Sequence, residues 1–515
     1  MSTNIGVFLT KRAFMNPELE AIVDYATARR FSFRDLNQRA NRFANLARAS
    51  GIQKGDRVAL LLMNSVEYVE AFYGLAKIGA VVVPLNWRLV PDELAYILSN
   101  AGATMLVYGK EFAEQVSDLH GRGQSGTAIT QWIEVVPAAE RLPFAEHYET
   151  LMDAASDAEP EIGSGDDDHL FIMYTSGTTG LPKGVVHTHK TVAWALFSIA
   201  ATADTRFKDR YALALPLFHV GALTPLIGNL YVGITSVLLQ QFDPQVMWEI
   251  IEKEKITITL AVPAMLSFML GVPAFERIDY SSLRWIMSGA TPVPVTLIER
   301  YAELGIEIHQ VYGLTESGGP GCLISPDEAL ARIGSTGKAM FHTEVRVITP
   351  DGRDVAPGEP GEVIIRAAHN MVGYWDNPTA TAETIRDGWL HTGDVALMDA
   401  DGFVTIHDRM KDMVISGGEN VYPAEIENVL LSHPDIAETA VIGQPSARWG
   451  ESPFAVVVSS NPALDENAVL KFCDGKLARF KLPRGAAFVE TIPRNPTGKA
   501  LKRLLREQFP GPARE

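Results

Sequence analysis

The sequence predicts an α/β protein with a large N-terminal domain of layered α/β subdomains, a β-rich subdomain and a small α+β C-terminal domain. Three observations predict it. Amphipathic helical stretches alternate with short apolar runs up to about residue 166, as in layered α/β proteins. Gly, Pro and Asp then punctuate the short strands of residues 351–408. Finally, 515 residues exceed what one core usually supports, so at least two domains are expected.

The composition narrows the functional class. With 47% hydrophobic and 21% charged residues the chain is typical of globular proteins. The net charge of −17 argues against non-specific nucleic-acid binding. The two cysteines, Cys322 and Cys473, have no partner at metal spacing, which favours a reducing compartment. The apolar run of residues 5–9 is too short for a secretory signal, so a cytoplasmic location is expected.

The first 168 residues supply the elements of the first α/β layers. The predicted helices are residues 32–49 and 68–78, and the predicted strands are residues 57–62, 80–85 and 103–108. The last two strands are apolar and mostly β-branched, which is typical of parallel sheets. Residues 153–168, rich in Asp, Ser, Gly and Ala, are expected to be an exposed connector.

The next segment, residues 170–184, predicts a phosphate-binding loop. An apolar strand, residues 170–174, breaks into hydroxylic and small residues: Thr175, Ser176, Gly177, Thr178, Thr179 and Gly180. Backbone N–H groups and hydroxyls can converge on one anion there, and Lys183 adds a positive charge. It is not a Walker P-loop, because Pro182 precedes the lysine and Gly184 follows it. An ordinary Ser/Thr/Gly surface loop is the alternative.

Three later strands end in small or hydroxylic residues. Residues 211–217 run into Phe218 and His219, residues 283–287 into Ser288, Gly289 and Ala290, and residues 306–311 into Tyr312, Gly313, Leu314, Thr315 and Glu316. Such strand ends line ligand crevices in open α/β sheets. An aromatic ring there can stack on a purine and a carboxylate can hold Mg²⁺. A core histidine with its hydrogen bonds satisfied is the alternative for His219.

Residues 256–275 carry no charge and reach the length of a membrane span. The alternating ITITL stretch instead predicts a strand ended by Pro263, followed by a short buried helix over residues 264–270 that ends before Pro273.

Towards the C-terminus the pattern changes again. Residues 389–394 place Asp394 at a predicted turn, where it could accept hydrogen bonds from a ribose or simply form an Asx turn. A helix over residues 421–431 and strands over residues 439–442 and 454–458 are expected. Basic residues dominate residues 471–506, which suggests a polyanionic ligand. A solvated basic helix over residues 499–506 accounts for part of this charge without a ligand.

Five motifs in one order resemble the acyl-adenylate-forming superfamily: YTSGTTGLPKG from Tyr174, YGLTES from Tyr312, WLHTGD from Trp389, DRMKDMVISGGENVYPAEIE from Asp408 and PRNPTGK from Pro493. The resemblance covers nearly the whole chain. It is nearest to bacterial fatty-acyl-CoA synthetases and extends to hydroxycinnamate- and aryl-CoA ligases. It implies an AMP-forming acid–thiol ligase, in which a carboxylate attacks the α-phosphate of ATP and CoA then displaces AMP.

The resemblance also implies an arrangement and a set of site residues. Residues 1–410 would bind ATP and the acid, and residues 411–515 would form a mobile domain hinged at Lys411. The catalytic residues would be Lys499, Thr315, Glu316 and His219, with Mg²⁺ on Glu316. The nucleotide residues would be Thr175, Ser176, Gly177, Thr178, Thr179, Gly180, Lys183, Gly289, Ala290, Tyr312, Asp394 and Arg409. The CoA residues would be Ser416, Gly417, Gly418, Trp449, Lys481 and Arg484.

The sequence is also compatible with other functions. An aryl- or hydroxycinnamate-CoA ligase shares every motif, and an adenylating enzyme that serves a carrier protein shares the first step. A nucleotide-binding regulator would lack Glu316 or Lys499, and both are present. Departures from the family pattern are Thr291, where Ala or Gly is more usual, and Ala339, where Pro is usual. A homodimer and, at most, peripheral membrane contact through Arg206, Lys208 and Arg210 are also considered.

Overall fold

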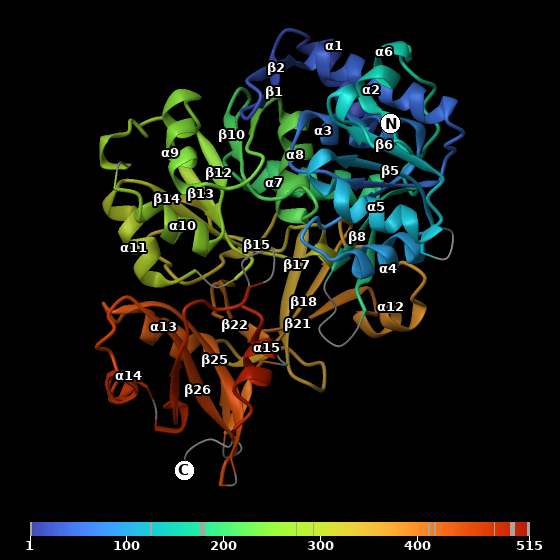
Figure 1. Ribbon diagram of the computed structural model, residues 1–515. Helices are drawn as coiled ribbons and strands as arrows, with labels where there is room; N and C mark the ends of the chain where they lie inside the picture. Colours follow the sequence, from blue (N-terminus) through green and yellow to red (C-terminus); the bar gives the residue numbers. More distant parts are fainter. Residues whose placement is uncertain are drawn as a thin grey trace.

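The computed structural model describes residues 3–123, 126–175, 181–273, 275–291, 293–409, 412–416, 419–446, 448–477, 479–494 and 500–511, with the backbone alone at 276, 408, 409, 419, 420 and 480. Within these residues the chain forms two large sheets, a smaller antiparallel sheet and a C-terminal mixed sheet (Figure 1). The predicted α/β class is confirmed.

The first large sheet has eight strands among the described residues and is mainly parallel. Its order is β19 (Gly373–Tyr374), β9 (Lys183–Thr188), β8 (His169–Thr175), β4 (Val81–Pro84), β3 (Arg57–Leu61), β5 (Ala103–Gly109), β6 (Gln131–Val135) and β7 (Glu146–His147). The helices connected to it are α1 (Ile5–Met15), α2 (Phe33–Ala49), α3 (Val66–Ile78), α4 (Pro91–Ala101), α5 (Ala113–Gly121) and α6 (Tyr148–Ala154).

The second large sheet has nine strands among the described residues. Its order is β16 (Lys338–Ala339), β15 (Cys322–Leu323), β14 (Glu307–Tyr312), β13 (Trp285–Ser288), β12 (Ile258–Leu260), β10 (Arg210–Leu213), β11 (Thr235–Leu238), β1 (Glu20–Asp24) and β2 (Arg29–Ser32). Its helices are α7 (His189–Thr202), α8 (Val220–Val232), α9 (Pro244–Lys253), α10 (Pro263–Leu270) and α11 (Val295–Glu303).

The apolar pattern of the strands explains how the layers stack. In β3, Val58 and Leu60 join a core shared with α1, α2, α3, α7, α8 and strands of the second sheet. Ala59 and Leu61 face α4 and α5 on the opposite side. Both faces of the parallel strands are therefore covered, which is why the central residues of β3 and β4 are apolar on both faces. A matching core under α9, α10 and α11 covers the outer face of the second sheet.

Local sequence fixes the ends of the predicted helices. Ser32 caps α2 with a capping box, its hydroxyl accepting from the backbone of Asp35 while the Asp35 carboxylate accepts from the backbone of Ser32. The strand and short helix predicted after residue 256 are present as β12 and α10, but the strand ends at Leu260 and Pro263 is the first residue of the helix. Among the described residues, no helix has the length and apolar content to cross a bilayer.

The third sheet differs from the prediction at Asp394. It consists of β17 (Thr343–Ile348), β18 (Pro360–Ala367), β21 (Trp389–Met398), β20 (Ile385–Arg386) and β22 (Val404–Arg409), with α12 (Pro378–Thr384) beside it. The prediction that Asp394 occupies a turn is wrong, because β21 continues through it. Gly393, with φ of 67°, and a shift of register between β18 and β21 produce a bulge inside the strand that resembles a turn in the sequence.

The C-terminal sheet contains β24 (Glu419–Val421), β23 (Val414–Ser416), β26 (Gly450–Ser459), β25 (Ile436–Ser446) and β27 (Ala486–Phe488), with α13 (Pro423–Leu431), α14 (Glu466–Cys473) and α15 (Lys502–Gln508). Val421 ends a strand and does not begin α13, and α15 begins at Lys502, later than predicted. Among the described residues, each apolar cluster of this part contains only residues after 412.

Candidate active site

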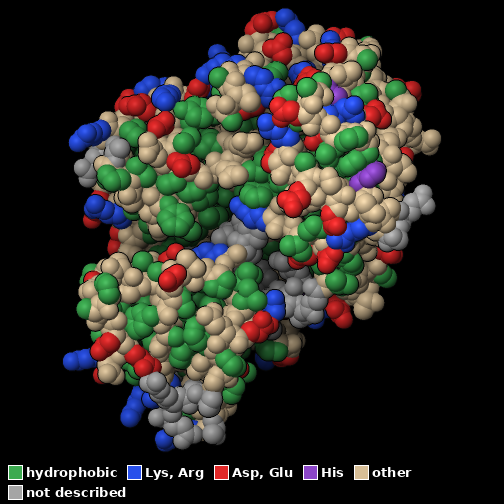
Figure 2. All heavy atoms as spheres, in the orientation of Figure 1, with side chains coloured by type: hydrophobic (Ala, Val, Ile, Leu, Met, Phe, Trp, Pro, Cys, Tyr) green, Lys and Arg blue, Asp and Glu red, His purple; other side chains and the backbone are tan. Residues whose placement is uncertain are grey.

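One large cleft gathers seven of the predicted site residues. It has a volume of about 1590 Å³ and reaches from the ends of β8, β13 and β14 to α15 of the C-terminal part. Figure 2 shows the molecule hollowed between its larger N-terminal part and its C-terminal part. The predicted site residues that line the cleft are Thr175, Lys183, His219, Gly289, Ala290, Thr315 and Glu316. Strand ends distant in sequence therefore meet at one crevice, as expected for α/β sheets.

The predicted phosphate segment joins two antiparallel strands. β8 ends at Thr175, β9 begins at Lys183, and these two residues are register partners. The Lys183 ammonium nitrogen lies 4.9 Å from the centre of the Tyr374 ring, a cation–π contact at the cleft. The structure does not describe the predicted loop residues between Thr175 and Lys183: Ser176, Gly177, Thr178, Thr179 and Gly180. Both flanks of the segment border the cleft.

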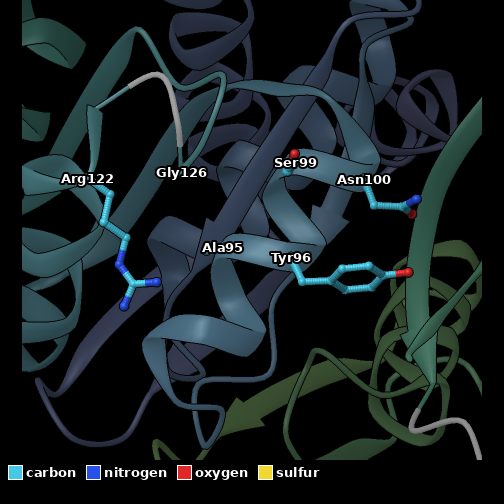
Figure 3. Close-up of a pocket in the computed structure, with 6 residues that line it drawn as sticks. All are labelled: Ala95, Tyr96, Ser99, Asn100, Arg122 and Gly126. Carbon is cyan, nitrogen blue, oxygen red and sulfur yellow. The ribbon is translucent and has the colours of Figure 1, made fainter. Parts of the chain in front are cut away.

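Asn100 of α4, which lines a smaller hollow of about 550 Å³, supports the end of β8. In Figure 3, Tyr96 and Asn100 extend from the same side of α4, and Arg122 lies on the other side of this helix in the view. The Tyr174 hydroxyl donates to the Asn100 side-chain oxygen over 2.6 Å, and the Trp375 indole donates to the Asn100 carbonyl over 3.0 Å. Asn100 therefore ties α4 to the residue immediately before the phosphate segment.

The YGLTES motif forms a tight turn after β14. The chain passes through Gly313 into the 3₁₀ turn η5 (Thr315–Ser317). A Cβ atom on residue 313 would lie 1.6 Å from the Gly319 carbonyl oxygen, so the turn requires glycine there. Thr315 and Glu316 both line the cleft. A hydroxyl and a carboxylate thus reach the crevice side by side.

The Glu316 carboxylate fits a magnesium ligand. Its Oε1 accepts a hydrogen bond from the Tyr374 hydroxyl over 2.8 Å. Its Oε2 has no hydrogen-bond or ion-pair partner within the part of the chain that the structure describes. Mg²⁺ takes oxygen ligands and is usually held by one or two carboxylates together with substrate phosphates. The donor set is therefore suited to a Mg²⁺ ion that arrives with ATP.

The predicted ribose residues come together. Asp394 and Arg409 are register partners in β21 and β22, although the side chain of Arg409 lies outside the description. The Tyr312 hydroxyl donates to Asp394 Oδ2 over 2.7 Å, and both side chains are buried. The two predicted nucleotide contacts are thus linked directly. Stacking of Tyr312 on adenine stays a prediction: the residue is 8% exposed and is not among those that line the cleft.

His219 occupies the N-cap position of α8, six residues after β10 ends. Strand 211–217 was predicted too long, because β10 stops at Leu213. Burial lowers the pKa of His219 to about 3, so the ring is neutral at neutral pH. Its Nε2 is buried and lacks a hydrogen-bond partner among the described residues. The alternative of a core histidine with its hydrogen bonds satisfied does not fit this orphaned nitrogen at the cleft.

The predicted CoA residues lie apart from the cleft. Ser416 is the register partner of Gly450, the residue that follows Trp449. The Arg448 guanidinium lies over the Trp449 ring, 4.8 Å from its centre. The Lys481 ammonium is ion-paired with Glu425. Arg484 is partly exposed, and Gly417, Gly418 and the hinge candidate Lys411 fall outside the described residues. Unlike the nucleotide residues, these candidates do not converge on a described pocket.

The sequence prediction missed three side chains that support the turn: Tyr374, His187 and His369. Tyr374 and His369 lie in a stretch with no motif around it. His187 offered one signal, because an imidazole interrupts the apolar strand KGVVHT. A buried strand rarely carries a titratable side chain without a specific partner.

Family profiles and curated relatives agree with this geometry. The profile of the "AMP-binding enzyme" family matches residues 9–375, and that of the "AMP-binding enzyme C-terminal domain" matches residues 425–499. The chain is 46% identical over 506 residues to the long-chain-fatty-acid–CoA ligase FadD13 of Mycobacterium tuberculosis (strain ATCC 25618 / H37Rv), covering 98% of both chains. It is 39% identical over 508 residues to a feruloyl-CoA synthase of Amycolatopsis sp, covering 98% of this chain and 99% of the relative.

The solved structures give the same result. The crystal structure of the anthranilate CoA ligase AuaEII in complex with anthranoyl-AMP matches with a TM-score of 0.90 at 29% identity, covering 99% of this chain and 97% of that one. The family profile covers more than half of the chain, and the relatives align along nearly all of it. The resemblance drawn from the five motifs is confirmed, and the chain belongs to the AMP-binding enzyme family.

Proposed function

We propose that the protein is an ATP-dependent acyl-CoA synthetase, an AMP-forming acid–thiol ligase that converts a carboxylic acid to acyl-AMP and then to acyl-CoA. The observation that carries the proposal is the convergence of Lys183, Thr315, Glu316 and His219 on one cleft. A cation, a hydroxyl and a carboxylate suited to Mg²⁺ are what a triphosphate needs. The neutral His219 ring faces the same space, where an acid would meet the nucleotide.

The roles of the chain's residues follow from charge. Lys183 would neutralise the β- and γ-phosphates, and the Thr315 hydroxyl would donate to the α-phosphate. Glu316 would hold Mg²⁺, which supplies the remaining positive charge at the phosphates. Asp394, fixed by Tyr312, would accept hydrogen bonds from the ribose with Arg409 beside it. These groups reduce the repulsion between two anions that have to approach each other.

The division of the chain into residues 1–410 and a mobile domain of residues 411–515 stays a proposal. It is supported by the separate apolar clusters after residue 412. Arg494 and Ala500, which flank Lys499, both line the cleft, while the CoA candidates do not. This arrangement suits the adenylation step. The CoA step would need a different face of the C-terminal domain, reached by rotation about Lys411.

We propose a medium- or long-chain fatty acid as the substrate. The cleft extends along α7 and α8, where Thr224 and Asn229 are its polar lining residues and most of the others are apolar, among them Leu196, Ile199, Ala200, Gly228, Val232 and the following Ile234. An elongated apolar chain fits such a continuation. Feruloyl-CoA synthase is among the relatives, so an aryl- or hydroxycinnamate-CoA ligase is the second candidate. An adenylating enzyme that serves a carrier protein is a third.

A panel of acids tests the substrate. We expect CoA-dependent AMP release with medium- or long-chain fatty acids to exceed that with benzoates and cinnamates. A Cβ on Gly228 would lie 3.6 Å from Leu196, so Gly228→Leu would narrow the cleft there. This variant is expected to disfavour long acids by about tenfold or more relative to short ones. Turnover of aryl acids alone would refute the fatty acid, and acid-dependent ATP–pyrophosphate exchange with no AMP release on addition of CoA would favour the carrier-protein alternative.

Peripheral membrane contact remains a prediction, as do a homodimer and a cytoplasmic location. Two of the three basic residues predicted to contact the membrane are ion-paired: Arg206 with Asp204, and Arg210 with Glu20 and Glu254. Pairing reduces their attraction for anionic headgroups, so we expect only weak binding at ~1 kcal/mol or less per basic residue. Sedimentation with phosphatidylserine vesicles at low and high salt measures it. The contact is excluded if the protein stays in the supernatant at both salt concentrations.

A further inference from the structure

Every main-chain carbonyl of residues 314–318 accepts a hydrogen bond. Within the turn, the amides of Ser317 and Gly319 donate to the Leu314 carbonyl, and the Gly318 amide donates to the Thr315 carbonyl over 3.0 Å. From outside it, the Met371 amide donates to the Glu316 carbonyl over 2.8 Å, and the Thr224 hydroxyl donates to the Gly318 carbonyl over 2.9 Å. The turn that presents Thr315 and Glu316 to the cleft is therefore held from behind along its whole length.

Two buried histidines bind the Thr315 and Ser317 carbonyls from outside the turn. His187 Nε2 lies 2.8 Å from the Thr315 carbonyl oxygen, and His369 Nδ1 lies 2.8 Å from the Ser317 carbonyl oxygen. Both rings have no exposed surface. They come from different elements, because His187 belongs to β9 and His369 follows β18. The two bonds enclose Glu316 on both sides in sequence.

The partners assign the proton positions of both rings. A carbonyl oxygen can only accept, so Nε2 of His187 and Nδ1 of His369 carry hydrogen. The other nitrogen of each ring faces a threonine hydroxyl that can donate, Thr191 at 3.1 Å and Thr343 at 2.7 Å. Burial lowers the pKa of each histidine to about 4, which keeps both rings neutral at neutral pH. Each ring is thus a fixed, uncharged donor.

We propose that His187 and His369 are positioning residues that fix the turn carrying Thr315 and Glu316 in the orientation that binds Mg²⁺ and nucleotide. The inference rests on the proposed function. His187 also lies on β9, the strand that begins at Lys183, so its bond joins the phosphate-side strand directly to the turn. The lysine, the hydroxyl and the carboxylate would then keep their relative positions as a unit. Neither histidine lines the cleft, which separates this role from catalysis itself.

Variants that remove or retain the donor test the proposal. His187→Leu and His369→Leu remove the N–H group. His187→Gln places an amide near the Nε2 position, and His369→Asn places one near the Nδ1 position. The matched control is His189→Leu, because His189 is equally buried but accepts from the Ile5 amide and does not contact the turn. Calorimetric titration with ATP at several Mg²⁺ concentrations, ATP–pyrophosphate exchange and thermal unfolding are measured for all five.

We expect the Leu variants to bind MgATP about tenfold more weakly, to need several-fold more Mg²⁺, and to lose on the order of 10²-fold in kcat for exchange. The Gln and Asn variants should recover most of this. His189→Leu should lower the melting temperature while MgATP binding stays within twofold. The proposal is overturned if folded Leu variants bind MgATP like wild type, or if His189→Leu loses as much. A wild type that binds MgATP but makes no acyl-CoA would refute the proposed function alone, since binding still decides the histidine role.

Discussion

The Lys499→Ala variant is expected to form acyl-AMP at least about 10²–10³-fold more slowly than wild type. The reaction brings a carboxylate close to the α-phosphate, and the variant lacks the cation that would reduce the repulsion between these two anions. The described residues on either side of the lysine, Arg494 and Ala500, line the cleft. Lys499 itself lies outside the described residues. ATP–pyrophosphate exchange with a fatty acid measures the adenylation rate.

The same variant is expected to convert supplied acyl-AMP and CoA to acyl-CoA within a few-fold of the wild-type rate. In the second step the domain carrying Lys499 would have rotated about Lys411, so the lysine no longer contributes. Lys476→Ala is the control, because Lys476 is an exposed lysine of the same domain that does not line the cleft. Equal collapse of both steps in a folded Lys499→Ala protein would contradict the two-orientation mechanism. No change in either step would show that the residue is merely a surface lysine.

Glu316→Gln is expected to abolish both half-reactions at limiting Mg²⁺. The amide oxygen can still accept from the Tyr374 hydroxyl, so the turn keeps its support while the charge is lost. Without the carboxylate, Mg²⁺ is held by the phosphates alone and their charge is less well neutralised. Exchange and thioester formation are measured across a Mg²⁺ titration.

The exposed Glu303 provides the matched control for this charge removal, since its only described ion pair is with Arg300 on the surface of α11. Glu303→Gln should behave like wild type in both assays. If Glu316→Gln catalyses ATP–pyrophosphate exchange at the wild-type rate at limiting Mg²⁺, Glu316 is not a magnesium ligand. Partial recovery at high Mg²⁺ would support the assignment, because mass action then replaces the missing ligand.

Periodic patterns predicted the elements that position the site. The strand at residues 170–174 could be read from sequence alone, because burial on both faces leaves a continuous apolar run. The small and hydroxylic residues that follow it, and those that follow residues 306–311, marked where the two strands end. The bulge at Gly393 could not, because a left-handed glycine inside a paired strand has the same composition as a turn. Pairing across the sheet decides between them.

The side chains behind the site were out of reach for a different reason. His187 contacts the Thr315 carbonyl from 128 positions away, and Tyr374 contacts Glu316 from 58 positions away. Such contacts depend on how two sheets meet, which local periodicity does not encode. Likewise, Tyr312 carries the expected ring, but its hydroxyl bond to Asp394 emerges only when β14 and β21 come together.

The separate apolar clusters of the C-terminal part have a thermodynamic consequence. Within the described residues, no cluster mixes residues before 410 with residues after 412, and contacts across the boundary include the polar pair His407 and Glu425 at 3.3 Å. Heat capacity changes chiefly when apolar surface gains or loses contact with water. A rotation that leaves both cores intact would therefore proceed with a small heat-capacity change, so its enthalpy change would stay nearly constant with temperature and a van't Hoff plot of its equilibrium would be close to linear.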